Sequence, residues 1–285
     1  MYKLYEAVPK SQANLYGQRA IEESENPFFD GPCLLCISAG GIHFDKNVFG
    51  TTKQGMEMAR MRVRGHRNAG FCLKDFPIKF LSMKLDSKSQ DRKMTEDERI
   101  DTFATQYLLP LISSNGTKID STQAMKNMRN VNIMSYCDGT LVVQSIEKNL
   151  LNKMHELGYT DEECKKIQSQ MCMFPIATDR LTGTQKSTCI SFKDINDSEV
   201  SDNITLEECK KVSESAIGES VFLYSKNEIA YLFKGDGEHS LKKYKHSGKA
   251  MSACLSSALS KALENSILNS QGESFVPITS RTTYC

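Results

Sequence analysis

The sequence has no long apolar run and no excess of charge of either sign, and these absences exclude several classes of protein. No stretch approaches the roughly 18 uninterrupted apolar residues that a membrane-spanning helix needs. Lys and Arg number 36 and Asp and Glu number 35, so the formal net charge is +1. The chain therefore lacks the basic excess of a nucleic-acid groove and the acidic block of a disordered tail. We expect a globular protein without a nucleic-acid partner or a membrane span, and its 285 residues suit one large domain or two modest ones.

The amino-terminal residues also lack the pattern of a secretory signal. Residues 1–7 include no apolar segment after a basic start, which a signal peptide would require. We therefore expect a cytoplasmic protein, although export by a non-classical route is compatible with the same sequence.

The cysteines are numerous but do not form a disulfide or metal pattern. Ten in 285 residues fall far below the density of a disulfide-rich scaffold. Most lie in apolar runs, as Cys172 and Cys189 do, which indicates reduced thiols that act as small core residues. Cys33 and Cys36 form a Cys-x-x-Cys pair, but residues three apart on a strand point to opposite faces. Because no second Cys or His pair follows at zinc-finger spacing, the sequence predicts no metal site and no cofactor.

Strand and helix patterns alternate from residue 32 onward, which predicts an α/β protein. Patterns typical of strands lie at 33–38, 78–85, 130–134, 171–176, 187–192, 221–224 and 229–233, and helical patterns lie at 95–110, 140–157, 205–217 and 249–268, with a short helix from 160 and a weak one at 51–64. The alternation favours a three-layer α/β/α sandwich with a mostly parallel sheet. We expect residues 31–285 to form this single domain, with 1–30 as an irregular segment that packs on the sheet and adds at most an edge strand.

Two helix starts and one helix end are marked by local signals. Thr95 and Thr160 are each followed three residues later by a glutamate, which is the pattern of a capping box. Gly158 follows the apolar pattern of 140–157 and is expected to end that helix.

The strongest functional signal is the segment Ser135-Tyr-Cys137-Asp-Gly139, between an apolar strand and a long helix. A side chain on a tight strand-to-helix turn takes a strained backbone, so the residues two positions away must be small. The helix that follows directs the positive end of its dipole at the thiol, which favours thiolate. The pattern therefore predicts that Cys137 is a nucleophile.

The segment Ser135–Gly139 resembles the nucleophile elbow, G-x-S-x-G, of the α/β-hydrolase superfamily. Cys137 stands in place of the usual serine, which is similar to the dienelactone-hydrolase branch, and Ser135 stands in place of the first glycine. The resemblance is architectural and covers residues 32–270. It implies an α/β-hydrolase-like fold and a catalytic triad.

The resemblance implies the chain order nucleophile, acid, histidine. Asp194 follows the strand at 187–192, where the family places its acid, and Asp197 is the alternative acid. His239 follows the strand at 229–233 in a glycine-flanked loop, where the family places its base.

The other histidines are less suited to the role of base. His155 lies within the helix that follows Cys137, and His246 lies beyond the expected loop, beside the start of the last helix. The remaining two, His43 and His66, both precede the nucleophile.

The resemblance also implies an oxyanion hole, made by backbone amides of Asp138 and of the Gly40–Gly41 turn after the first buried strand. His43 follows these glycines, whereas the histidine of glycine-rich esterase loops precedes them, so His43 receives no catalytic role. The carboxylate of Asp138 beside the nucleophile would raise the pKa of the Cys137 thiol if it pointed into the site.

Three hypotheses follow. The leading one is a hydrolase or acyltransferase with a Cys137–His239–Asp194 triad that acts on a small ester or thioester through an acyl-enzyme, its oligomeric state left open. The second is a catalytically inactive hydrolase-like module used for binding or signalling. The third is a doubly wound nucleotide-binding protein. The absence of a G-x-G-x-x-G or Walker pattern after the first strand argues against it.

Overall fold

The structure is a computed structural model of the chain. It describes residues 2–9, 16–20, 25–31, 33–37, 79–85, 95–137, 139–178, 187–201, 220–224, 228–233 and 235–239. Within these ranges, no helix is both long enough and apolar enough to cross a membrane. The expected helices at 51–64, 205–217 and 249–268 and the turn at Gly40–Gly41 lie outside the described residues.

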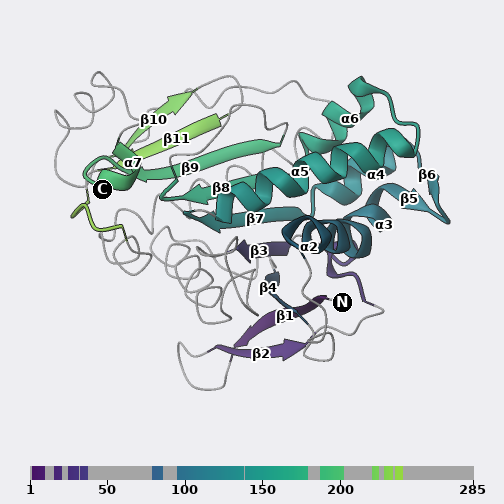
Figure 1. Cartoon of the computed structure of the whole chain (residues 1–285), viewed down its shortest axis with the longest axis horizontal. Coiled ribbons are helices and arrows are strands. Elements are labelled where there is room, and N and C mark those ends of the chain that lie inside the picture. The colour runs from purple at the N-terminus through teal and green to yellow at the C-terminus, as the bar shows by residue number, and fades with distance from the viewer. Residues whose placement is uncertain are drawn as a thin grey trace.

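The described strands form a nine-stranded sheet (Figure 1). They are β1 (Tyr2–Pro9), β2 (Tyr16–Ala20), β3 (Cys33–Ile37), β4 (Lys79–Leu85), β7 (Val131–Tyr136), β8 (Cys172–Ile176), β9 (Thr188–Asp194), β10 (Ser220–Tyr224) and β11 (Glu228–Phe233). Their order across the sheet is β10-β11-β9-β8-β7-β3-β4-β1-β2. Every pairing from β4 through β3, β7, β8 and β9 to β11 is parallel, and the outer pairings are antiparallel. The sequence therefore predicted the strands after residue 32 and the mostly parallel sheet correctly.

The amino-terminal segment differs from the irregular segment that the sequence suggested. It forms two strands, with β1 pairing antiparallel to β4 and β2 completing the edge. An edge pairing depends on the partner strand more than on local preference, so weak alternation in the sequence was a poor guide.

The first helical region begins as expected but continues past its proline. Helix α2 (Glu96–Phe103) starts with the capping box, in which the Glu98 N–H donates to Thr95 Oγ1 at 3.3 Å. A π-helical segment, η3 (Ala104–Leu108), then joins it to α3 (Leu109–Ile112). In this widened turn the Leu109 N–H donates to the Ala104 carbonyl five residues back, directly before Pro110, which has no N–H to donate. The helix ends at Ile112, close to the expected end near Pro110.

The remaining helices precede or follow the central strands. They are η1 (Pro27–Phe29), α4 (Ser121–Met128), α5 (Gly139–Glu156), α6 (Asp161–Gln168) and the short α7 (Ser198–Ser201), with a small hairpin of β5 (Ser113–Ser114) and β6 (Thr117–Lys118). Gly158 ends α5 with a φ of 84°, and the Thr160–Glu163 capping box opens α6, both as predicted.

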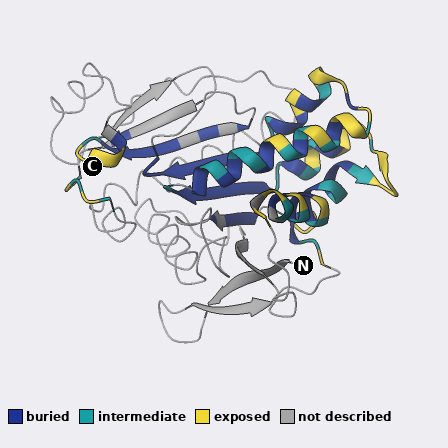
Figure 2. Cartoon of the chain, viewed as in Figure 1, coloured by how far each residue is buried: buried dark blue, intermediate teal, exposed yellow. Residues whose placement is uncertain are grey.

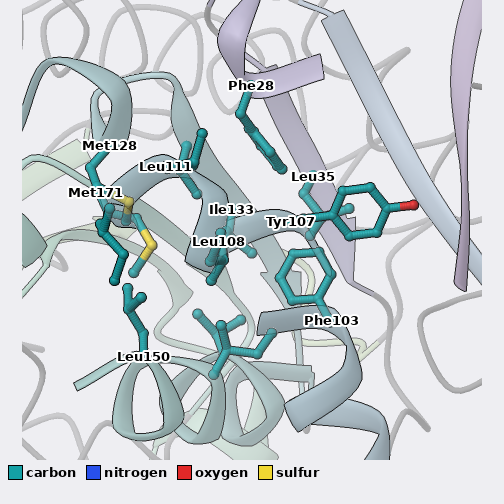
Figure 3. Packing of buried hydrophobic residues seen from close by; sticks show 14 of the residues in the cluster. Phe28, Leu35, Phe103, Tyr107, Leu108, Leu111, Met128, Ile133, Leu150 and Met171 are labelled. Carbon is teal, nitrogen blue, oxygen red and sulfur yellow. The ribbon is translucent and has the colours of Figure 1, made fainter. Parts of the chain in front are cut away.

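The core lies between the central strands and helices α2 to α6 (Figures 2 and 3). Every side chain of β7 is buried, so this strand is covered on both faces. Leu35 and Ile133 of the sheet pack in one cluster with Phe103, Leu108 and Leu150 of the helices (Figure 3).

The cysteines of this region separate into two kinds. Cys33, Cys164, Cys172 and Cys189 are reduced and buried, as expected of small core residues. Among the cysteines whose side chains the structure describes, Cys137 alone is only half-buried. Of these five cysteine side chains, the accessible one thus lies at the carboxyl end of the sheet's central strand.

Candidate active site

The site lies where the parallel strand order changes direction. After β3 the chain places β4 on one side of it, and the next parallel strand, β7, pairs with its other side. In open α/β sheets, ligands bind beyond the carboxyl ends of the strands at such a switch point. Cys137 directly follows β7 at this edge, and the arrowheads of β7, β8 and β9 point toward the same edge, where α7 lies (Figure 1).

Cys137 occupies a strained turn between β7 and α5. Its φ is 51°, in the left-handed region, which costs a residue with a Cβ roughly 1–2 kcal/mol. The turn is fixed by the Cys137 N–H, which donates to the Ile176 carbonyl at 2.9 Å, and by the Thr140 N–H, which donates to the Cys137 carbonyl at 3.1 Å. Helix α5 starts two residues later, at Gly139, so its positive end lies beside the thiol.

The small residues on either side fit the turn as the sequence suggested. Ser135 is buried, and its hydroxyl lies 3.0 Å from the Thr140 hydroxyl, so the polar atom that glycine would lack is hydrogen-bonded. Gly139 is buried at the start of α5. Serine at the first position of the motif is therefore compatible with this backbone.

His239 reaches the same edge from the loop after β11. Its Nδ1 lies 2.8 Å from Oδ2 of Asp197, which is completely buried. The imidazole ring stacks on Tyr136, the residue before Cys137, with 5.7 Å between the ring centroids. The side chain is 14% exposed, and its contacts with Asp197 and Tyr136 fix the position of the ring.

The carboxylate beside the ring is Asp197 and not Asp194, which was the first choice of acid from the sequence. Asp194 instead accepts hydrogen bonds from the backbone N–H groups of Gly235, at 2.7 Å, and Gly237, at 3.1 Å, and from that of Asn196. A Cβ on Gly235 would overlap the Asp194 carboxylate, so this approach requires glycine. Asp194 thus fastens the loop that carries His239, and Asp197 contacts the ring.

A third side chain, Glu199 of α7, completes a cluster that sequence reasoning missed. One ligand atom each of Cys137, Glu199 and His239 lies within 4.8 Å of the other two. The Glu199 carboxylate lies 3.3 Å from His239 Nε2, although the side chain is 63% exposed. Nε2 is buried and makes no hydrogen bond to any residue that the structure describes. The only hint in the sequence was that Glu199 follows the alternative acid by two positions.

Of the other histidines and predicted site residues, the structure describes only His155. Gly40, Gly41 and Asp138, proposed for the oxyanion hole, lie outside the described residues, as do His43, His66 and His246. His155 lies in the last turn of α5, with Nε2 3.5 Å from the Asp161 carboxylate, at the end of the helix remote from Cys137.

The described cluster combines a thiol, an imidazole and two carboxylates. A buried carboxylate on one ring nitrogen sets the tautomer and leaves the other nitrogen to accept a proton. The same three donor atoms of Cys137, His239 and Glu199 are also ligand types that divalent metals accept. A comparison with protein-family models finds no match, and a search of curated proteins finds no significant relative.

Proposed function

We propose that the protein is a hydrolase or acyltransferase that uses Cys137 as nucleophile, His239 as general base and Asp197 as the acid that orients the ring. The observation that carries the proposal is the 2.8 Å contact of Asp197 with His239, within 4.8 Å of a half-buried thiol on a strained strand-to-helix turn. Nucleophile, base and orienting group in this arrangement are the components of a triad.

The order of these residues along the chain supports an α/β-hydrolase type of enzyme. Cys137, Asp197 and His239 follow β7, β9 and β11, which gives the order nucleophile, acid, histidine of that superfamily. The parallel strands that carry them belong to one sheet.

The mechanism proceeds by acyl transfer to sulfur. His239 donates its Nδ1–H to Asp197, so Nε2 takes the proton of the Cys137 thiol while the sulfur attacks the acyl carbonyl carbon. The oxyanion that forms accepts hydrogen bonds from backbone amides, for which Asp138 and the Gly40–Gly41 turn remain our candidates. The imidazolium then gives its proton to the departing alcohol or thiol. Water or a second acceptor attacks the acyl-cysteine in a reversal of the same steps.

The substrate class is a small activated acyl compound, an ester or a thioester. Attack of a thiolate on a thioester forms one carbon–sulfur bond and breaks another, and the leaving thiol resembles the attacking one in basicity, so this exchange is close to balanced. A thioester is therefore the better first substrate for an assay.

A binding module that has lost catalysis is the second candidate, and Glu199 is the observation that favours it. Its carboxylate lies 3.3 Å from His239 Nε2, where it competes with the sulfur for the imidazole. If this contact persists when substrate is present, His239 is held by two carboxylates and does not serve the thiol.

Acyl-enzyme trapping separates the two candidates. The protein is mixed with p-nitrophenyl acetate and with an acetyl thioester, and acetylated peptides are mapped by mass spectrometry. We expect a burst of released p-nitrophenol and acetylation confined to Cys137, both lost in His239→Gln. His155→Gln is the matched control and should keep both signals. Acetylation spread over several cysteines, or equal in His239→Gln, would reject the triad.

A further inference from the structure

The cluster of Cys137, His239 and Glu199 has the composition of a metal site as well as that of a nucleophile and base. Zinc is bound in proteins by thiolate, imidazole and carboxylate, and sites with three protein ligands leave a fourth position for water. The thiolate and the carboxylate would together neutralise the charge of a divalent cation. Thiolate and imidazole favour zinc over magnesium or calcium, which prefer oxygen ligands.

The distances are close to those of a tetrahedral site. Zinc-to-ligand bonds of about 2.0–2.3 Å place the ligand atoms roughly 3.3–3.8 Å apart. The nitrogen and oxygen of His239 and Glu199 are already 3.3 Å apart, and the three ligand atoms all lie within 4.8 Å of one another. Because the Glu199 side chain is 63% exposed, its carboxylate can move toward the Cys137 sulfur without disturbing the core.

A second, independent observation concerns the histidine. Metal-bound histidines characteristically donate their other ring N–H to a carboxylate, which orients the ring and raises its basicity. Asp197 occupies this position on Nδ1, at 2.8 Å. The opposite atom, Nε2, is buried, and its 3.3 Å contact with the Glu199 carboxylate does not have the geometry of a hydrogen bond. A cation between the two atoms would satisfy both.

We propose that Cys137, His239 and Glu199 form a site for a soft divalent cation, zinc foremost, with Asp197 as the carboxylate behind the histidine. Binding converts the Cys137 thiol to a zinc-bound thiolate, and the displaced proton goes to solvent. The cation would occupy the sulfur and Nε2 together. Zinc would therefore inhibit acyl transfer, and this consequence alone rests on the proposed function.

Cobalt titration tests the site without any substrate. Apo protein, prepared under reducing conditions and freed of chelator, is titrated with Co²⁺, followed by displacement with Zn²⁺. We expect the visible bands of tetrahedral cobalt and a near-ultraviolet sulfur-to-cobalt charge-transfer band. Both should disappear when one equivalent of zinc is added.

Variants with matched controls locate the site. Cys137→Ser should remove the charge-transfer band, and Glu199→Gln should weaken cobalt binding roughly tenfold or more, since losses of 10–100-fold accompany even the removal of supporting groups. Glu162→Gln changes a carboxylate that is 78% exposed and pairs with Lys166, and His155→Gln changes a histidine outside the cluster. Both controls should bind cobalt as the wild type does.

The Glu199→Gln variant keeps the test decisive even if a change at Cys137 or His239 disturbs folding. An unchanged charge-transfer band in Cys137→Ser, or equal cobalt affinity in wild type and Glu199→Gln, would overturn the proposal. Zinc inhibition of acetyl thioester turnover is measured in parallel. Cobalt binding at Cys137 without turnover would support the metal site and contradict the proposed hydrolase activity. Turnover without cobalt binding would support the hydrolase activity and contradict the metal site.

Discussion

The two ends of helix α5 differ in how the sequence fits the backbone. At its end, Gly158 takes a φ of 84°, a conformation that glycine adopts without strain, and a regular capping box follows. At its start, Cys137 takes a φ of 51° although it carries a Cβ. The left-handed backbone is therefore unstrained at the carboxyl end of α5, where it is occupied by glycine. It is strained at the amino end, where it is occupied by a cysteine.

Strain by itself does not identify the site. Ala177 directly follows β8, next to β7 in the sheet, and has a φ of 52°. Its N–H donates to the Phe192 carbonyl just as the Cys137 N–H donates to the Ile176 carbonyl. The left-handed residue is thus a feature of this sheet edge, and the thiol close to His239 is what distinguishes Cys137.

The largest expected effect is the loss of turnover in Cys137→Ala. Removal of a triad nucleophile lowers kcat by roughly three or more orders of magnitude, so thioester hydrolysis should fall by at least that amount. Ala177→Gly changes the equivalent position of the neighbouring strand end and should leave kcat close to that of the wild type. Equal kcat in Cys137→Ala would show that the chemistry lies elsewhere.

The two aspartates should separate activity from stability. Asp197→Asn keeps the size of the side chain beside His239 but fixes the wrong tautomer, so kcat should fall about a thousandfold or more. Asp194→Asn removes an acceptor for Gly235 or Gly237 and should cost about 1–3 kcal/mol in the free energy of unfolding. Steady-state kinetics and denaturant melts on both variants check the pair. A larger loss of kcat in a fully folded Asp194→Asn than in Asp197→Asn would reverse the assignment.

Single substitutions at the two ends of α5 test the backbone strain directly. Gly158→Ala should lower the free energy of unfolding by about 1–2 kcal/mol, because a Cβ there meets no atom within 4 Å and only the backbone is strained. Cys137→Gly relieves the same strain and should not lower stability, although it removes the proposed nucleophile. Thermal melts of both variants measure the difference. Comparable destabilisation by the two changes would contradict the account of the strained turn.

The smallest expected effect is a pH dependence at the α6 capping box. The pKa of Glu163 is lowered from 4.5 to about 2 by hydrogen bonds from the Ser121 hydroxyl and the Thr160 N–H. A lowered pKa in the folded state means that this stabilisation is complete above pH 4.5 and is lost as the pH falls toward 2. Melting temperatures measured across this range should show a smaller acid-dependent loss in Glu163→Gln than in the wild type.

The matched change at Glu162, an exposed partner of Lys166, should alter that pH dependence less. A Glu163→Gln variant with the same acid sensitivity as the wild type would indicate that the capping box contributes nothing to it.

Local signals in the sequence predicted those parts of the fold that depend on interactions between residues close together along the chain. The Thr95–Glu98 capping box involves residues three apart, and the β7 strand is a mostly apolar run. The widened turn at Ala104–Leu108 was not predicted, because no single residue signals it. One edge strand was expected from residues 1–30, whereas the second was missed because β1 pairs with β4 and β2 pairs with β1.

The candidate site shows the same division. The Cys137 turn and the position of His239 after β11 could be predicted from small residues and element order. The choice between Asp194 and Asp197 could not, because both follow one strand and their partners come from a loop far along the chain. The contact of Asp197 with His239 spans 42 residues of sequence, and that of Asp194 with Gly235 spans 41. Glu199 was missed because only the packing of α7 against β9 brings it to His239.

The pH dependence of Cys137 alkylation tests the central claim, that this thiol is activated by His239. Peptide-resolved labelling with iodoacetamide compares Cys137 with Cys172, whose pKa burial raises to about 12, so that it serves as an unreactive internal reference. We predict that Cys137 reacts with a midpoint well below the roughly 8.5 of a free thiol and that His239→Gln returns the midpoint toward that value. A wild-type midpoint at or above the free-thiol value, unchanged in His239→Gln, would contradict the account.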